Sequence, residues 1–246
     1  MKISSTIKLA SILIKEQFRE PIGIFWSLIA PAGFFCFANW TDKEAMSHGS
    51  HFMLKAAWYL AYISFTTALF GFGLYLVGRR ESGFVRSFAY SRRARSQFIS
   101  AQLCASLTLA LAYGVFFLLI ASVTFQANLN AAEVGIMFLR FTITTAVLMM
   151  GCLIFSTLPL TFQNASNLMS IFSMPLIMLG LASQHFAASG LGWINNINPY
   201  FAAGFFVANP LSQLGQIFPV GHAVLCLMLG CFALLHFRIN PVWSRY

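Results

Sequence analysis

The sequence predicts an all-α membrane protein with six transmembrane helices. Of its 246 residues, 59% are hydrophobic and only 9% are charged, whereas a soluble domain carries about 25% charged residues. So little charge cannot cover a soluble surface, and 27 Phe residues exclude an intrinsically disordered chain. A spanning helix needs about 20 apolar residues, so this length accommodates roughly six spans with short loops.

The N-terminal segment, residues 1–21, predicts an amphipathic helix that lies on the membrane surface. Its apolar side chains recur at steps of three and four residues, and Pro21 ends the pattern. The apolar positions are Ile3, Ile7, Ala10, Ile14 and Phe18. Residues 22–246 then form the six-span transmembrane domain.

Six apolar runs predict the spans, and one broken segment precedes the last of them. The expected spans are 22–38, 56–78, 98–125, 134–158, 168–183 and 220–237. Residues 184–218 mix Gly, Asn and Pro with Phe and Val, which favours an external re-entrant hairpin. Pro31 lies inside the first span and Pro175 inside the fifth.

Basic residues set the expected orientation. Lys and Arg number 15 against 6 Asp and Glu, a net charge of +9. Six arginines lie in residues 79–97, where Glu81 is the single acid, and others lie near both termini. Because cytoplasmic loops collect Lys and Arg, both termini and this loop are expected in the cytoplasm, and the charge needs no nucleic-acid partner.

The order of several short motifs resembles the type 2 permease subunits of ATP-binding-cassette (ABC) exporters. In chain order these motifs are Arg19-Glu20-Pro21, Phe25-Trp26, Ala30-Pro31, Arg80-Glu81-Ser82-Gly83-Phe84-Val85-Arg86, Met174-Pro175-Leu176, Trp193-Ile194 and Asn198-Pro199-Tyr200-Phe201. The resemblance covers essentially the whole chain. One departure is Leu179-Gly180, where the family usually has Ser-Gly.

The resemblance implies one half of a membrane pore, paired with a second permease chain that is identical or related. Two ATPase subunits would dock on the cytoplasmic face, and they would bind the ATP and Mg²⁺. The chain itself holds no cofactor and has no phosphate-loop motif. Coupling to the ATPase falls to Glu16, Glu81, Gly83 and Arg86, while Pro31, Pro175, Asn198 and Pro199 would shape the pore and hairpin. The expected location is the plasma membrane, or the inner membrane of a Gram-negative cell.

The expected cargo is a hydrophobic or amphipathic compound, such as a drug, a peptide or a lipid-linked molecule. Phe and Met are abundant, and the spans lack the acidic chain that an ion-coupled carrier needs. Two alternatives stay open: a membrane-embedded assembly or binding subunit without transport, and a secondary carrier outside the ABC class.

Arg140 is the exceptional charge, because it lies inside the fourth span. Glu133 precedes it by seven residues, roughly on the same helical face. An ionisable residue inside a span indicates function, while the alternative is a side chain that reaches up to the headgroups. The functional alternative predicts that Arg140→Ala lowers export and leaves membrane insertion normal.

Enzyme and metal sites are poorly supported by the sequence. Ser189-Gly190 and His222 suggest a protease dyad, but the first glycine of the protease motif is absent. His48 and His51 fit a solvated external loop better than a zinc site. The five cysteines lie in apolar runs and form no disulfide pattern. We therefore expect a transport subunit that is not an enzyme and binds no metal.

Overall fold

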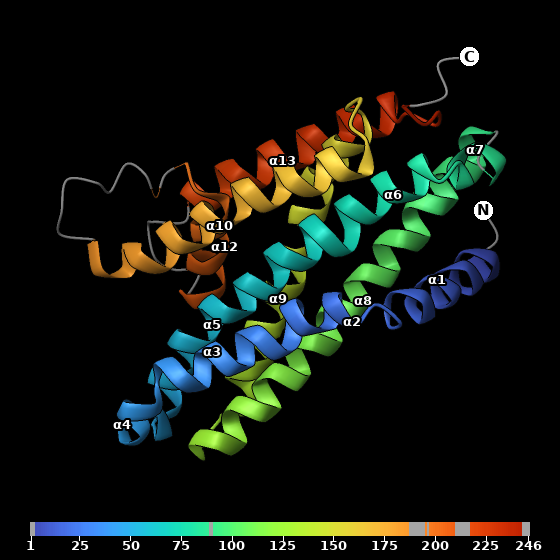
Figure 1. Ribbon diagram of the computed structural model, residues 1–246. Helices are drawn as coiled ribbons and strands as arrows, with labels where there is room; N and C mark the ends of the chain where they lie inside the picture. Colours follow the sequence, from blue (N-terminus) through green and yellow to red (C-terminus); the bar gives the residue numbers. More distant parts are fainter. Residues whose placement is uncertain (1–2, 89–90, 187–194, 196, 210–216, 243–246) are drawn as a thin grey trace.

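The computed structural model describes residues 3–88, 91–186, 195, 197–209 and 217–242, and all regular secondary structure within them is helical (Figure 1). The elements are α1 (Ile3–Gln17), α2 (Pro21–Ile24), η1 (Phe25–Ile29), α3 (Ala30–Ala38), η2 (Trp40–Asp42), α4 (Lys43–Ser47), α5 (Gly49–Thr66), η3 (Thr67–Leu74), α6 (Tyr75–Glu81), α7 (Phe84–Phe88), α8 (Arg92–Phe125), α9 (Ala131–Cys152), η4 (Leu153–Ser156), α10 (Phe162–Phe186), α12 (Pro199–Ala208) and α13 (Ile217–His236). Segments η1 and η3 are π-helical, and η2 and η4 are 3₁₀-helical.

Five helices are long and apolar enough to cross a membrane, which confirms the all-α, multi-pass class. They are Gly49–Glu81, Arg92–Phe125, Ala131–Ser156, Phe162–Ala182 and Pro219–His236. These correspond to the second to sixth expected spans. The first expected span contains a shorter apolar helix, Phe25–Ala38.

The continuous helix α5–η3–α6 lies at the centre of the bundle. Phe35 of α3 packs edge-to-face against Phe52 and Tyr59 of this helix, and against Phe117 and Phe125 of α8. Because aromatic rings bury large apolar areas, this cluster fixes α3 to both long helices. Helix α13 lies at the edge of the bundle and exposes a row of apolar side chains (Figure 1).

Pro31 occupies a position that explains the preceding π-helical turn. A proline lacks the N–H of a regular helix, and its ring clashes with the carbonyl four residues earlier. Segment η1 ends just before it, and the N–H of Ala30 bonds to the carbonyl of Phe25. The wider turn of η1 makes room for the ring, so the helix continues through Pro31.

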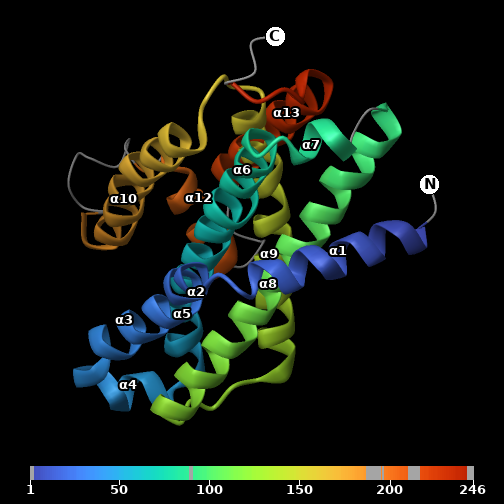
Figure 2. The same ribbon diagram turned by 45° about the vertical axis from the view of Figure 1, so that its right-hand side comes forward.

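Helix α1 forms as predicted, and one of its faces packs against α8. Figure 2 shows α1 lying across α8. The buried positions are Thr6, Ala10, Leu13 and Gln17, whereas Ile7 and Phe18 are exposed. On this face, Gln17 donates a hydrogen bond to Ser106 of α8 (3.5 Å). That the apolar side chains of α1 lie on the membrane stays a prediction: Ile7 and Phe18 are free to face lipid, whereas Ala10 is buried against the protein and Ile14 is half-buried.

The expected hairpin, residues 184–218, is only partly described. Residues 187–194, 196 and 210–216 lie outside the described residues, and they include Trp193-Ile194 and Ser189-Gly190. The described part forms helix α12, which packs against α5 and buries Tyr200, Ala202 and Val207.

Candidate functional site

A cavity of about 620 Å³ lies between the start of the chain and the central helix. Its walls come from the α1–α2 region with η1, from α5 with η3, from α8 and from α10. The lining residues are Gln17, Glu20, Gly23, Trp26, Ser27, Tyr62, Thr66, Thr67, Phe70, Gly71, Leu74, Tyr75, Leu109, Tyr113, Phe162, Ser166, Ser170, Ser173, Met174 and Ile177. A drug-sized ligand fits such a volume.

Both π-helical segments of the chain's described part face this cavity. Trp26 and Ser27 come from η1, and Thr67, Phe70 and Gly71 come from η3. Turns of this type are frequent at functional sites because they displace side chains from regular helical register.

Polar side chains of α8 and α1 support η3. The carbonyl of Gly71 accepts hydrogen bonds from Ser106 (3.1 Å) and Gln102 (3.3 Å). Ser106 also accepts from Gln17 of α1. The network thus joins α1, α8 and the cavity wall inside the bundle.

Hydroxyl groups line much of the cavity. Ser166, Ser170 and Ser173 lie on one face of α10, at the spacing of successive helical turns. Across from them Thr67 is buried, and its hydroxyl has no partner among the described residues. Sequence reasoning missed this wall because the serines are embedded in an apolar run. Their separations of four and three residues nevertheless indicate that they share one face of a helix.

Glu16 lies beside the cavity and is held by two residues of α6. It forms an ion pair with Arg79, and the hydroxyl of Tyr75 donates to its Oε2 (2.7 Å). Arg79 in turn donates to the Tyr75 hydroxyl (2.6 Å). The predicted coupling residue Glu16 therefore joins α1 to α6, next to a cavity-lining tyrosine.

Arg80 is fully buried at the same end of the bundle. Its Nη1 donates to the carbonyls of Ser156 (3.1 Å) and Leu158 (2.7 Å), and its Nη2 donates to Leu160. Its Nε donates to Glu81 (3.1 Å). Sequence reasoning assigned no special role to Arg80, because nothing in a run of arginines distinguishes the one that turns inward.

The other predicted coupling residues lie close to Arg80. The carboxylate of Glu81 faces inward, to Arg80 and to the amide of Val242. Gly83 has φ +76°, a left-handed conformation that favours glycine, and it turns the chain from α6 into α7. Arg86 is exposed on α7. We call this arginine-rich part of the molecule, residues 79–95, the basic end.

Arg140 caps a helix and does not pair with Glu133. Its guanidinium donates to the carbonyl of Asn209, which follows the last residue of α12. Cations near a helix C-terminus are stabilising. Glu133 is exposed, and the two salt bridges found in the described part of the chain do not include it.

Asn198 and Pro199 start helix α12 and fasten it to α10. Oδ1 of Asn198 accepts from the amides of Tyr200 (3.0 Å) and Phe201 (3.3 Å), as an N-cap does. Its Nδ2 donates to the carbonyl of Leu176 in α10 (2.7 Å). Pro175 lies one residue before that carbonyl, inside α10 and exposed.

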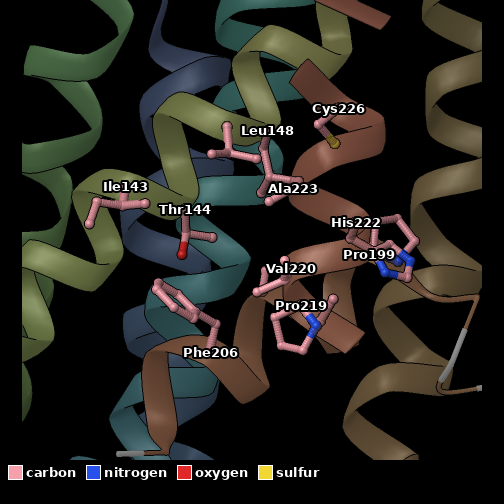
Figure 3. Close-up of a pocket in the computed structure, with 13 residues that line it drawn as sticks. Ile143, Thr144, Leu148, Pro199, Phe206, Pro219, Val220, His222, Ala223 and Cys226 are labelled. Carbon is pink, nitrogen blue, oxygen red and sulfur yellow. The ribbon is translucent and has the colours of Figure 1, made fainter. Parts of the chain in front are cut away.

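A second pocket, of about 90 Å³, lies where α9, α12 and α13 meet (Figure 3). In Figure 3, Thr144 of α9 lies near Phe206 of α12, and Leu148 of α9 lies beside Ala223 of α13. Its volume holds little more than a few water-sized groups, so it is a packing gap and not a cargo site. No cluster of three or more potential metal ligands occurs among the described residues.

Taken together, the apolar helices and the cavity within them define a multi-pass α-helical membrane protein. The chain is similar to Protein McbE of Escherichia coli, with 30% identity over 241 residues that cover 97% of this chain and 98% of McbE. The chain therefore belongs to the same family as McbE. No protein-family model and no solved structure matches it.

Proposed function

We propose that the chain is the membrane permease subunit of an ABC exporter. It would move a hydrophobic or amphipathic compound out of the cytoplasm, with ATP hydrolysed by a separate ATPase. The cavity carries the proposal, because it is large enough for such a cargo and is walled by four parts of the bundle. The resemblance of the ordered motifs to type 2 permeases supports the same function.

Six spans follow if the first apolar helix also crosses the membrane. Helical structure runs unbroken from Pro21 to Ala38, and a helix of about 18 residues is roughly 27 Å long. A hydrocarbon core is about 30 Å thick. In this arrangement α12 is part of the external re-entrant hairpin. Helix α1 begins and α13 ends on the same side of the molecule as α7 (Figure 1), and the positive-inside rule assigns this side to the cytoplasm.

The basic end would dock an ATPase subunit, and the complex of two permease chains would hold two ATPase subunits. Arg86 is the predicted coupling residue whose charge faces outward, so it is the proposed contact. Glu81 and Gly83 would hold and orient α7, and Glu16 would carry its movement to α1 through Arg79. A second permease chain, identical or related, would complete the pore within the lipid bilayer.

Purification from the native host in mild detergent tests this proposal. We expect mass spectrometry to find a stoichiometric ATPase with a phosphate-loop motif. Arg86→Ala should weaken the association, while Lys43→Ala, an exposed cation of α4 at the opposite end, should not. If no ATPase co-purifies under conditions that preserve other complexes, the proposal fails, and an assembly subunit or a secondary carrier becomes the better assignment.

A further inference from the structure

We propose that the cavity selects amphipathic cations, with the carboxylate of Glu20 as their charge partner. The inference rests on the proposed function in treating the cavity as the place where cargo binds. It narrows the cargo from hydrophobic or amphipathic compounds in general to those that carry a positive charge.

The charges of the lining residues favour a positively charged ligand. Glu20 is the acid among them, and they include no Lys, Arg or His. Glu20 takes part in neither salt bridge of the described residues. The nearby cation Arg79, which contacts the cavity-lining Tyr75, is already paired with Glu16. A chain with a net charge of +9 thus has a cavity whose own formal charge is negative.

Aromatic rings strengthen the preference for a cation. Trp26, Tyr62, Phe70, Tyr113 and Phe162 all line the cavity. Ring faces attract cations, more so where water is excluded. Glu20 is itself exposed, so water screens part of its attraction for a cation, and the aromatic rings supply the rest of the preference. An anion of equal size meets an unfavourable charge and the negative faces of the same rings.

One hydroxyl in the cavity wall is buried without a hydrogen-bond partner in the described part of the chain. Thr67 is 2% exposed and its Oγ1 has no hydrogen-bond partner among the described residues. Leaving such a group unpaired costs free energy, so native proteins usually give it a partner. Thr67 lines the cavity, but its Oγ1 is itself closed off from solvent, so the proposal rests on Glu20 and the aromatic rings.

Two ions of the same shape and opposite charge provide the test. Tetraphenylphosphonium and tetraphenylborate would be titrated into the purified full chain in detergent, with protein-free micelles subtracted. We expect tetraphenylphosphonium to bind more tightly. Glu20→Gln should weaken the binding of tetraphenylphosphonium about tenfold, which corresponds to about 1.4 kcal/mol. It should not weaken the binding of tetraphenylborate.

Two matched variants separate charge from other effects. Glu20→Asp keeps the charge and should keep most of the affinity, while Glu44→Gln removes an exposed acid of α4 outside the cavity and should change nothing. Glu20 is exposed, so its variants should fold. The inference would be overturned if the two ions bound with equal affinity, or if Glu20→Gln left the affinity for tetraphenylphosphonium unchanged. Because this assay needs no ATPase, its outcome is independent of the co-purification test.

Discussion

The main-chain amide of Val242 donates a 3.0 Å hydrogen bond to Oε1 of Glu81, and the same oxygen accepts a 3.1 Å bond from Nε of Arg80. One carboxylate oxygen thus fastens the segment after α13 to the end of α6. Through Arg80, the connection continues to the carbonyls of Ser156, the last residue of η4, and of Leu158, which precedes α10. Three segments far apart in the sequence depend on this pair.

The first prediction concerns Arg80. Arg80→Met removes the donor from several carbonyls and leaves Glu81 without its cation, so we expect a loss of about 3 kcal/mol or more. This loss of stability is measured by thermal unfolding in detergent, with the fraction of monodisperse protein as the signal. Arg86→Met removes an exposed arginine of α7 and should stay within about 0.5 kcal/mol of the wild type. Equal melting of the two variants would refute the assigned role of Arg80.

The second prediction concerns two close contacts of glycines. A Cβ at Gly180 would overlap the Tyr200 ring, and one at Gly204 would overlap the Trp58 ring. We expect Gly180→Ala and Gly204→Ala each to cost about 1–3 kcal/mol, because a packed core does not yield to added volume. Gly33→Ala is the control, since its Cβ meets nothing within 4 Å and alanine favours a helix. Melting temperatures that fall equally in all three would contradict this explanation.

The third prediction is a measurable coupling between α1 and α6. A double-mutant cycle with Glu16→Gln and Arg79→Met should give about 0.5–1 kcal/mol of interaction free energy. The value is modest because the Glu16 side chain is 43% exposed, and it should shrink in high salt. Additive effects of the two substitutions on unfolding would show that the pair does not hold α1.

The fourth prediction concerns Arg140. Because its guanidinium caps α12, we expect Arg140→Ala to lower the free energy of unfolding by about 1–2 kcal/mol. Export should fall only as far as the amount of folded protein falls. Glu133→Gln, on the same helix, should change neither. Lost export with unchanged thermal stability would instead favour the functional alternative drawn from the sequence.

The fold class and five of the spans were predictable because each is encoded by the length of an apolar run. The buried face of α1 was not, since the bond between Gln17 and Ser106 depends on a helix some 90 residues away. The π-helical segment η3 was equally unpredictable from the sequence, because the residues that support it, Gln102 and Ser106, are distant along the chain. Glu16 was selected in advance because it lies on the amphipathic helix, and Asn198 because it lies in the Asn-Pro motif, while the serines of α10 and Arg80 were missed.

The length of α8 has a consequence for how the protein meets the aqueous phase. Its 34 residues make a helix of about 51 Å, whereas a hydrocarbon core is about 30 Å thick. Since arginines are costly in lipid, the surplus of about 20 Å belongs on the side where α8 begins with Arg92 and Arg93. The end of α8 that begins at Arg92 then projects beyond the lipid headgroups. A soluble protein could bind this helical surface without contacting lipid.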